Sequence, residues 1–228
     1  LCAEDPNNDF LPSPGPVDVW EPSPIGNARY DSGVESGSVI AVEFDAMIAK
    51  VISHAPTRRE AAAKLARALE TTSIQGLTTN RDFLISTLRS EAYLAGDTTT
   101  DFIERVEPAR TREIGPEEYA ESVIAATMAS QALNRRNAKV LKSVRSGWRN
   151  SMLPFEILEF STESTTWRVE YRSQRDGRFR VQLADQEFLV DVVESYNDSI
   201  RLDIDGKRIS YKVRRSGDEW HIHSHRGD

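Results

Sequence analysis

The second half of the chain alternates apolar and polar residues in short runs, and this pattern constrains the fold more than any other feature. A period of two is typical of β-strands that bury one face. Pairs typical of tight turns separate the runs, among them Asp176-Gly177, Asn197-Asp198, Asp205-Gly206 and Ser216-Gly217. We therefore predict seven or eight antiparallel strands in a meander that closes into a barrel. The apolar members are Phe155, Ile157, Val169, Tyr171, Phe179, Val181, Leu183, Phe188, Val190, Val192, Ile200, Leu202, Ile204, Ile209, Tyr211, Val213, Trp220 and Ile222.

A long helix is predicted directly before these strands. Pro116 suits a first helical residue, and Glu117 and Glu118 lie near the positive end of the helix dipole. The helix should continue to about Arg136 and span roughly 30 Å. Because a barrel interior has to be filled, this helix is expected to pack inside the barrel. Its apolar side carries Tyr119, Val123, Met128 and Leu133. The small side chains that give it a narrow cross-section are Ala125, Ala126, Ala129 and Ala132.

The first half predicts short strands followed by helices. Residues 1–53 contain too many prolines for a helix. Residues 46–52 could form either a buried strand or a helical turn. A capping box of Thr57 with Glu60 opens a helix over residues 57–70. Thr79 or Asn80 should cap a second helix, a short third helix should end before Pro108, and the fold class is α+β. Other expected strand residues are Val17, Val19, Trp20, Arg29, Tyr30, Val39 and Ala41, with a hairpin joining the last four.

Charge and cysteine content exclude several classes of function. Residues 1–107 carry 9 basic and 17 acidic side chains, and residues 108–228 carry 20 and 19. The acidic half argues against nucleic-acid binding, and no apolar run is long enough to span a membrane. Cys2 is the single cysteine, which excludes an intrachain disulfide and suggests a reducing compartment. The charge shift near residue 107 predicts a domain boundary with a linker at 108–115.

Five short motifs occur in order over the first hundred residues, and together they resemble one enzyme family. The similarity is to the C-terminal subdomain of biotin carboxylase, the ATP-dependent half-enzyme of biotin-dependent acyl-CoA carboxylases. Because the chain opens as if inside a strand, we expect it to be a fragment of a longer polypeptide. The motifs are AEDP (Ala3 to Pro6), FLPSPG (Phe10 to Gly15), ARYDS (Ala28 to Ser32), FDAMIAK (Phe44 to Lys50) and GLTTN (Gly76 to Asn80).

Residues 116–228 resemble the domain that follows biotin carboxylase in α subunits of the propionyl-CoA and 3-methylcrotonyl-CoA carboxylase type. The similarity rests on a helix before a barrel, on its position, and on GWRN (Gly147 to Asn150). The resemblance implies a BT-type linker and docking domain after the biotin carboxylase subdomain at 1–107. Trp148 and Arg149 are the possible interface anchors, because Trp and Arg dominate binding hot spots. The alternative is a tryptophan plug at the barrel end.

The resemblance implies a ligase that forms a C–N bond, carboxylating carrier-bound biotin with ATP and bicarbonate. The implied cofactors are biotin, ATP and Mg²⁺ or Mn²⁺, with the last two bound mainly by residues outside this chain. Implied partners are a carboxyltransferase β subunit, a biotinyl carrier domain and an upstream ATP-grasp part, in a hetero-oligomer. The fragment alone should be inactive. The expected location is the cytoplasm of a bacterium or the mitochondrial matrix of a eukaryote. Alternatives are a non-catalytic docking module and an unrelated sugar- or peptide-binding barrel.

Arg29 is the candidate catalytic residue that the resemblance implies. Deprotonation of biotin puts negative charge on its ureido oxygen, and a fixed guanidinium aimed at that oxygen stabilises the charge as it develops. Arg suits this role because its planar fork stays charged and holds its orientation. The alternative is a structural ion pair with Asp31 or Glu35.

Two other groups of residues resemble a metal site and a pair of catalytic acids, and a structural role is the simpler interpretation of each. His221, His223 and His225 alternate on the last predicted strand and could together bind Zn²⁺ or Ni²⁺. Because no further ligand is visible, we favour a solvated terminal strand and predict no metal site. Glu4 and Asp5 resemble catalytic acids, but turn formation or contact with the nucleotide-binding part is the preferred interpretation.

Overall fold

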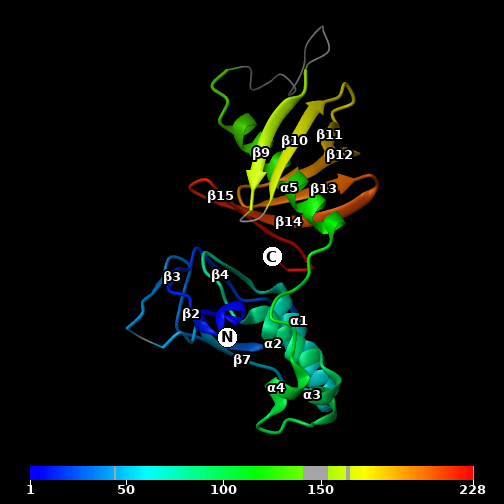
Figure 1. The fold of residues 1–228 in the computed structure, drawn as a ribbon. Helices are drawn as coiled ribbons and strands as arrows, with labels where there is room; N and C mark the ends of the chain where they lie inside the picture. Colours follow the sequence, from blue (N-terminus) through cyan, green and yellow to red (C-terminus); the bar gives the residue numbers. More distant parts are fainter. Residues whose placement is uncertain (44, 141–153, 163–164, 228) are drawn as a thin grey trace. The chain divides into compact units, whose positions relative to one another are not determined.

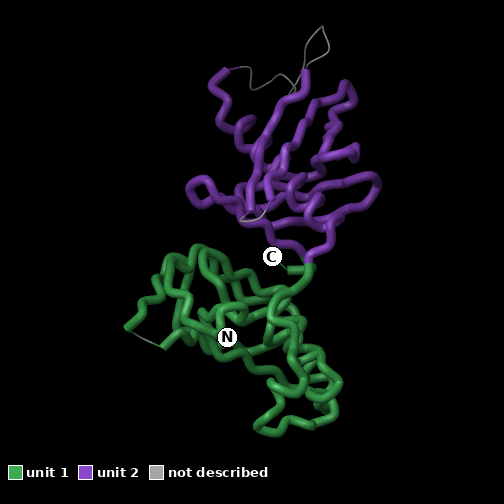
Figure 2. The backbone as a smooth tube through the Cα atoms, in the orientation of Figure 1, with its two compact units in different colours: residues 1–113, 225–228 green, residues 114–224 purple. Residues whose placement is uncertain are grey.

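The computed structural model of the chain describes residues 1–43, 45–140, 154–162 and 165–227. These residues divide into two compact units, which Figure 2 distinguishes by colour. Unit 1 contains Leu1–Glu113 together with His225–Asp228, and unit 2 contains Ile114–Ser224. No helix in the described ranges is both long and apolar enough to cross a membrane.

Unit 2 is a seven-stranded antiparallel sheet wrapped around one helix (Figure 1). Neighbours in the sheet are neighbours in the sequence, in the order β15-β14-β13-β12-β11-β10-β9. The meander predicted from the alternating runs is therefore confirmed, whereas its predicted closure into a barrel is wrong, because the two end strands of the described sheet are not paired. Its strands are β9 (Glu156–Ser161), β10 (Thr166–Ser173), β11 (Phe179–Leu183), β12 (Gln186–Ser195), β13 (Ser199–Ile204), β14 (Lys207–Ser216) and β15 (Glu219–His223).

The helix α5 (Pro116–Arg136) fills the concave side of this sheet, as the alanine-rich pattern predicts. Ile124, Ala125 and Met128 are completely buried among side chains from the strands. The sheet curls around the helix as a half-barrel, and β9 and β15 remain its two edges, with no ladder between them in the described part of the chain. The strand contribution to this core is Val169, Tyr171, Phe179, Val181, Leu183, Val190, Ile200, Leu202, Ile204, Ile209, Tyr211 and Val213.

The turns of unit 2 follow their sequence signals with one exception. Asp205 and Gly206 both adopt positive φ, as a tight hairpin turn between β13 and β14 requires. The β11–β12 turn was not predicted, because it is formed by Ala184 and Asp185 without glycine or asparagine. Ala184 nevertheless has a φ of 51°. The strand ladders on both sides impose this conformation on a residue that rarely adopts it.

Unit 1 combines four two-stranded ribbons with helices. Its ribbons pair β1 with β2, β3 with β6, β4 with β8, and β5 with β7. The predicted hairpin between the Arg29 and Val39 segments is wrong, because β5 pairs with β7 while β6 pairs with β3. The ambiguous run at 46–52 is a strand over part of its length. The strands are β1 (Glu4–Asp5), β2 (Leu11–Pro12), β3 (Gly15–Pro16), β4 (Val19–Glu21), β5 (Arg29–Ser32), β6 (Val39–Ile40), β7 (Ala49–Ile52) and β8 (Ser73–Gln75).

The helices of unit 1 agree with their start signals in most respects. The Thr57 hydroxyl accepts from the Glu60 backbone N–H at 3.2 Å, which is the first half of the predicted capping box. A short helix beginning after Ser90 was not predicted, although the Ser90 hydroxyl caps it. The helices are α1 (Arg58–Thr71), α2 (Arg81–Arg89), α3 (Glu91–Ala95) and α4 (Phe102–Val106), with 3-10 turns η1 (Pro6–Asn8) and η2 (Ile25–Asn27).

Gly76 lies at a close approach of two backbone segments in unit 1. It has a φ of 102°, and a Cβ at this position would lie 2.5 Å from the Pro16 carbonyl oxygen and 2.8 Å from the Asp18 nitrogen. The Asp18 N–H donates to the neighbouring Gln75 carbonyl at 2.9 Å, so the two segments cannot separate without losing that bond. Only glycine satisfies both the φ and the close approach.

We expect Gly76→Ala to destabilise the protein by about 1–3 kcal/mol more than Gly37→Ala. Gly37 is the matched control, because it also has positive φ (91°) but a Cβ there meets nothing within 4 Å. The difference therefore isolates the steric contact from the cost of left-handed backbone. Urea unfolding of the two variants measures it, and equal midpoints and slopes would contradict the close approach.

Replacement of Ala125 by a larger residue tests the fit of α5 inside the sheet. Ala125 is fully buried, so Ala125→Met should lower the free energy of unfolding of unit 2 by about 1–3 kcal/mol. Asn134→Met on the exposed side of the same helix should change it by less than about 0.5 kcal/mol. Thermal and urea unfolding followed by near-ultraviolet circular dichroism compares them. A tolerated Ala125→Met would mean that the helix does not fill the curled sheet.

Candidate functional site

The five motifs that carry the family resemblance are brought together in unit 1 by backbone hydrogen bonds. Ala3, which is fully buried, donates to the Ala46 carbonyl at 2.7 Å and accepts from the Ser13 N–H at 2.8 Å. The Leu1 carbonyl accepts from the Ile48 N–H at 2.9 Å. The AEDP, FLPSPG and FDAMIAK motifs are therefore adjacent, although Phe44 itself lies outside the described residues.

Asn80, the last residue of GLTTN, joins this group through both its side chain and its backbone. Its Oδ1 accepts from the Cys2 N–H at 2.9 Å, and its own N–H donates to the Cys2 carbonyl at 3.1 Å. Its Nδ2 also donates to Glu4 Oε2 at 3.1 Å. Asn80 occupies the N-cap position of α2, as expected, but its side chain makes no cap bond to that helix. An amide side chain carries its donor and its acceptor on separate atoms, so it can join two segments, and this was the signal available in the sequence.

The fifth motif, ARYDS, forms β5 and its ladder with β7. In this ladder Arg29 lies opposite Ile52 and Asp31 lies opposite Lys50. Tyr30 points the other way, where its hydroxyl lies 2.9 Å from Thr72 Oγ1 and donates to the Ala68 carbonyl at 3.3 Å. Because side chains alternate along a strand, the anchored Tyr30 directs its neighbours outward.

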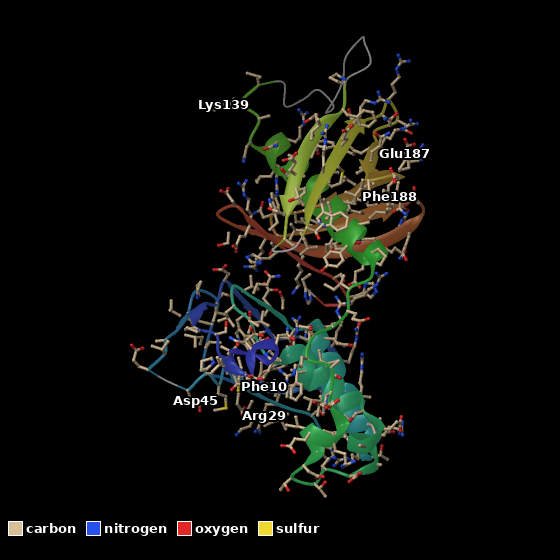
Figure 3. The ribbon with its side chains drawn as sticks, in the orientation of Figure 1. Phe10, Arg29, Asp45, Lys139, Glu187 and Phe188 are labelled. Carbon is tan, nitrogen blue, oxygen red and sulfur yellow. The ribbon has the colours of Figure 1, made fainter. Side chains whose placement is uncertain are left out.

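Arg29 is exposed on this outward face, as Figure 3 shows. Its Nη2 donates to Asp31 Oδ2 at 3.1 Å, and the side chains of Arg29 and Asp31 are 69% and 47% exposed. The ion pair with Asp31 that was weighed as an alternative therefore exists. It is open to solvent, and exposed pairs of this kind contribute little to stability. Among the described residues this is the only polar contact of the guanidinium, so most of its five N–H donors are available to a ligand.

The acidic residues of AEDP have structural partners. Asp5 Oδ1 accepts from the Asn7 N–H at 2.9 Å and caps the 3-10 turn η1, which confirms the expected turn formation. Glu4 accepts from Asn80, as described above. Burial raises the pKa of the Cys2 thiol above its usual value, which disfavours a nucleophilic role.

The three alternating histidines do not share one strand. Strand β15 ends at His223, so His225 lies beyond it. His223 is buried, so a fully solvated terminal strand is a wrong expectation for that residue. Within the described part of the chain, no group of three or more His, Cys, Asp or Glu side chains is placed to hold a metal ion. Trp148 and Arg149, the possible interface anchors, lie outside the described residues.

Two family models match the chain in succession. The biotin carboxylase C-terminal domain matches residues 1–105, and the BT domain of the methylcrotonyl-CoA carboxylase alpha subunit matches residues 119–228. The solved biotin carboxylase domain dimer of Hydrogenobacter thermophilus 2-oxoglutarate carboxylase is similar with a TM-score of 0.47 and 28% identity, covering 50% of this chain and 25% of that chain.

Curated relatives include carboxylase α subunits from bacteria and mitochondria. The biotin-dependent acyl-coenzyme A carboxylase alpha3 subunit of Mycobacterium leprae is 49% identical over 79 residues, which cover 35% of this chain and 13% of that protein. The mitochondrial methylcrotonoyl-CoA carboxylase subunit alpha of Rattus norvegicus is 29% identical over 204 residues, covering 83% and 28%. The chain thus spans less than a third of either relative's length. It is a biotin carboxylase C-terminal domain joined to a BT domain, and its homologues are biotin-dependent acyl-CoA carboxylase α subunits.

Proposed function

We propose that this chain contributes one wall of the active site in which ATP and bicarbonate carboxylate carrier-bound biotin. Membership of the carboxylase α subunits and the open position of Arg29 support this proposal. The proposed domains are the biotin carboxylase subdomain at 1–107, a linker at 108–115 and the BT-type domain at 116–228. Because the matched relatives are much longer, we assign the ligands of ATP, Mg²⁺ and bicarbonate and the general base to other parts of the polypeptide.

Arg29 would act on the group that accepts the carboxyl. Biotin supplies a ureido nitrogen that becomes nucleophilic only when its proton leaves, and the charge then resides largely on the ureido oxygen. The Arg29 guanidinium would donate to that oxygen and stabilise the charge as it develops. Asp31 holds one of its nitrogens at 3.1 Å and so limits the rotation of the fork. The single observation that carries the assignment is a guanidinium anchored on one side and open to ligand on the other.

Arg29→Ala tests this role in the complete α subunit. The rate of biotin carboxylation should fall about 100- to 1,000-fold, the usual loss when a charge-stabilising donor is removed, while ATP affinity stays the same. Arg59→Ala is the control, because Arg59 is also an exposed arginine in an exposed pair, with Glu91. Initial rates and ATP binding are measured side by side. Equal losses of carboxylation and ATP binding would count against the assigned role.

The second domain supports an assembly function. We propose that residues 116–228 dock the α subunit on a carboxyltransferase β subunit, with Trp148 and Arg149 as anchors, within a hetero-oligomer that also contains a biotinyl carrier domain. The BT-domain match supports this, and both roles can coexist, one in each domain. The proposed location is the bacterial cytoplasm or the mitochondrial matrix, in keeping with the bacterial and mitochondrial relatives.

Trp148→Ala and Arg149→Ala should weaken binding of the complete α subunit to the β subunit by roughly tenfold or more each, because hot-spot residues of these types dominate interface energies. Arg168→Ala is the control, since Arg168 is an exposed arginine of β10 paired with Glu170. Sedimentation velocity over a range of β-subunit concentrations measures the dissociation constant. Unchanged assembly in both variants would remove these residues as anchors.

A further inference from the structure

A pocket opens at the C-terminal end of α5, entirely within unit 2. Its volume is about 360 Å³, and it lies between the last turns of the helix and the turns that join β12 to β13 and β14 to β15. Leu133, Ile200, Val213 and Trp220 form its apolar wall. Ile200 and Val213 are buried, whereas Leu133 and Trp220 are only half-buried. The core of unit 2 therefore leaves part of its apolar surface uncovered at this end.

The charged side chains that line this pocket are both positive. They are Arg136 and Arg215, and no Asp or Glu is among the described lining residues, although the whole chain has a formal net charge of -7. Arg136 Nη1 donates to a neutral partner, Asn197 Oδ1, at 2.9 Å. Arg215 Nη2 donates to Asp218 Oδ1 at 3.1 Å, but the Asp218 side chain is fully exposed. Because exposed pairs contribute little, a carboxylate from a ligand can replace Asp218 at low cost.

The turn that carries Tyr196 is held in place by backbone hydrogen bonds. The Tyr196 N–H donates to the Ser199 carbonyl at 2.8 Å, and the Asp198 carbonyl accepts from the Val213 N–H at 2.9 Å. The Tyr196 side chain lines the pocket and is 61% exposed. A surface that is already formed before binding avoids part of the entropic cost of association.

These features together favour a protein segment as the ligand. Tyr, Trp and Arg are the residue types that dominate the hot spots of protein interfaces, and Arg binds carboxylates through paired N–H donors. The Arg215 guanidinium also lies 5.5 Å from the ring centroid of Trp220, so positive charge and apolar surface are adjacent. A segment with an acidic residue beside a large apolar side chain matches both.

We propose that this pocket binds an acidic segment of the carboxyltransferase β subunit, which inserts one large apolar side chain between α5 and the two turns. This inference rests on the proposed assembly function, and it adds a docking site formed by described residues to the anchors Trp148 and Arg149. The carboxylate of the segment binds Arg136 and Arg215 and displaces Asp218. Because the contact depends on opposite charges near the surface, it weakens as salt is added.

Arg215→Glu in the complete α subunit tests the charge of the pocket. The dissociation constant for the β subunit should rise roughly tenfold or more, because the reversed charge repels the carboxylate, and Arg215→Lys should recover part of the affinity. Arg178→Glu is the matched control: Arg178 is 47% exposed and pairs with Asp176, whereas Arg215 is 45% exposed and pairs with Asp218. Thermal unfolding of each variant checks that the fold is intact. An equal loss of affinity in Arg178→Glu overturns the inference.

A photoreactive p-benzoylphenylalanine in place of Tyr196 identifies the occupant. With the purified β subunit, the cross-linked peptide should come from that subunit and contain an acidic residue close to a large apolar one. A cross-link to the biotinyl carrier domain, a cross-link within the α subunit, or none at all overturns the inference. If the wild-type subunits assemble and Arg215→Glu assembles equally well, only the pocket inference fails. If the wild-type subunits do not assemble, the proposed assembly function fails with it.

Discussion

Unit 1 depends on the backbone hydrogen bonds of its first three residues. Its described sheets each have two strands, and an isolated two-stranded ribbon is marginally stable in water. Ala3 links the Ala46 and Ser13 segments, and Cys2 is held on both sides by Asn80. These bonds connect ribbons that are distant in sequence. The buried backbone at Ala3 therefore joins two-stranded ribbons, each only marginally stable alone, into one cooperative structure.

The geometry of the candidate site follows from this buried side. Tyr30 packs edge-to-face on Trp20, with ring centroids 6.3 Å apart, and its hydroxyl reaches Thr72. Strand alternation then places Arg29 and Asp31 toward solvent without any contact of their own in the core. Because exposed charges contribute little to folding, the chemistry of this face can be altered with small effects on stability. Substitutions at Arg29 therefore test the proposed ligand contact more directly than substitutions at Tyr30 would.

Unit 2 depends on an alanine-rich helix that is anchored to the sheet by a charged contact. The buried alanines of α5 let the curled sheet approach the helix on several sides. Lys207 of β14 donates to Glu121 at 2.7 Å and to Glu117 at 3.0 Å, and these bonds raise the pKa of Lys207 above its ordinary value. Glu121 is almost completely buried, so this contact fixes which side of the helix faces β14. Apolar packing alone leaves the rotation of an alanine-rich helix less well determined.

Local patterns in the sequence predicted much of this protein. Short stretches of sequence were enough to predict the strands of unit 2 and the helices α1 and α5. Strand periodicity, helix periodicity and end caps are local properties. Arg29 was found through the resemblance of ARYDS to a known motif, and its exposed pair with Asp31 was among the alternatives weighed.

The remaining features were decided by contacts between distant residues. The ribbons β3–β6 and β4–β8 were missed because strands of two or three residues carry too little pattern to specify a partner. Asn80 looked like a helix cap because its partners Cys2 and Glu4 are more than seventy residues away. By itself the sequence determined the longer helices and strands, their buried faces and the family resemblance. The tertiary structure decided which short strands pair, and so which charges share the face of Arg29, because that choice depends on burying Ala3, Tyr30 and Ala49 together.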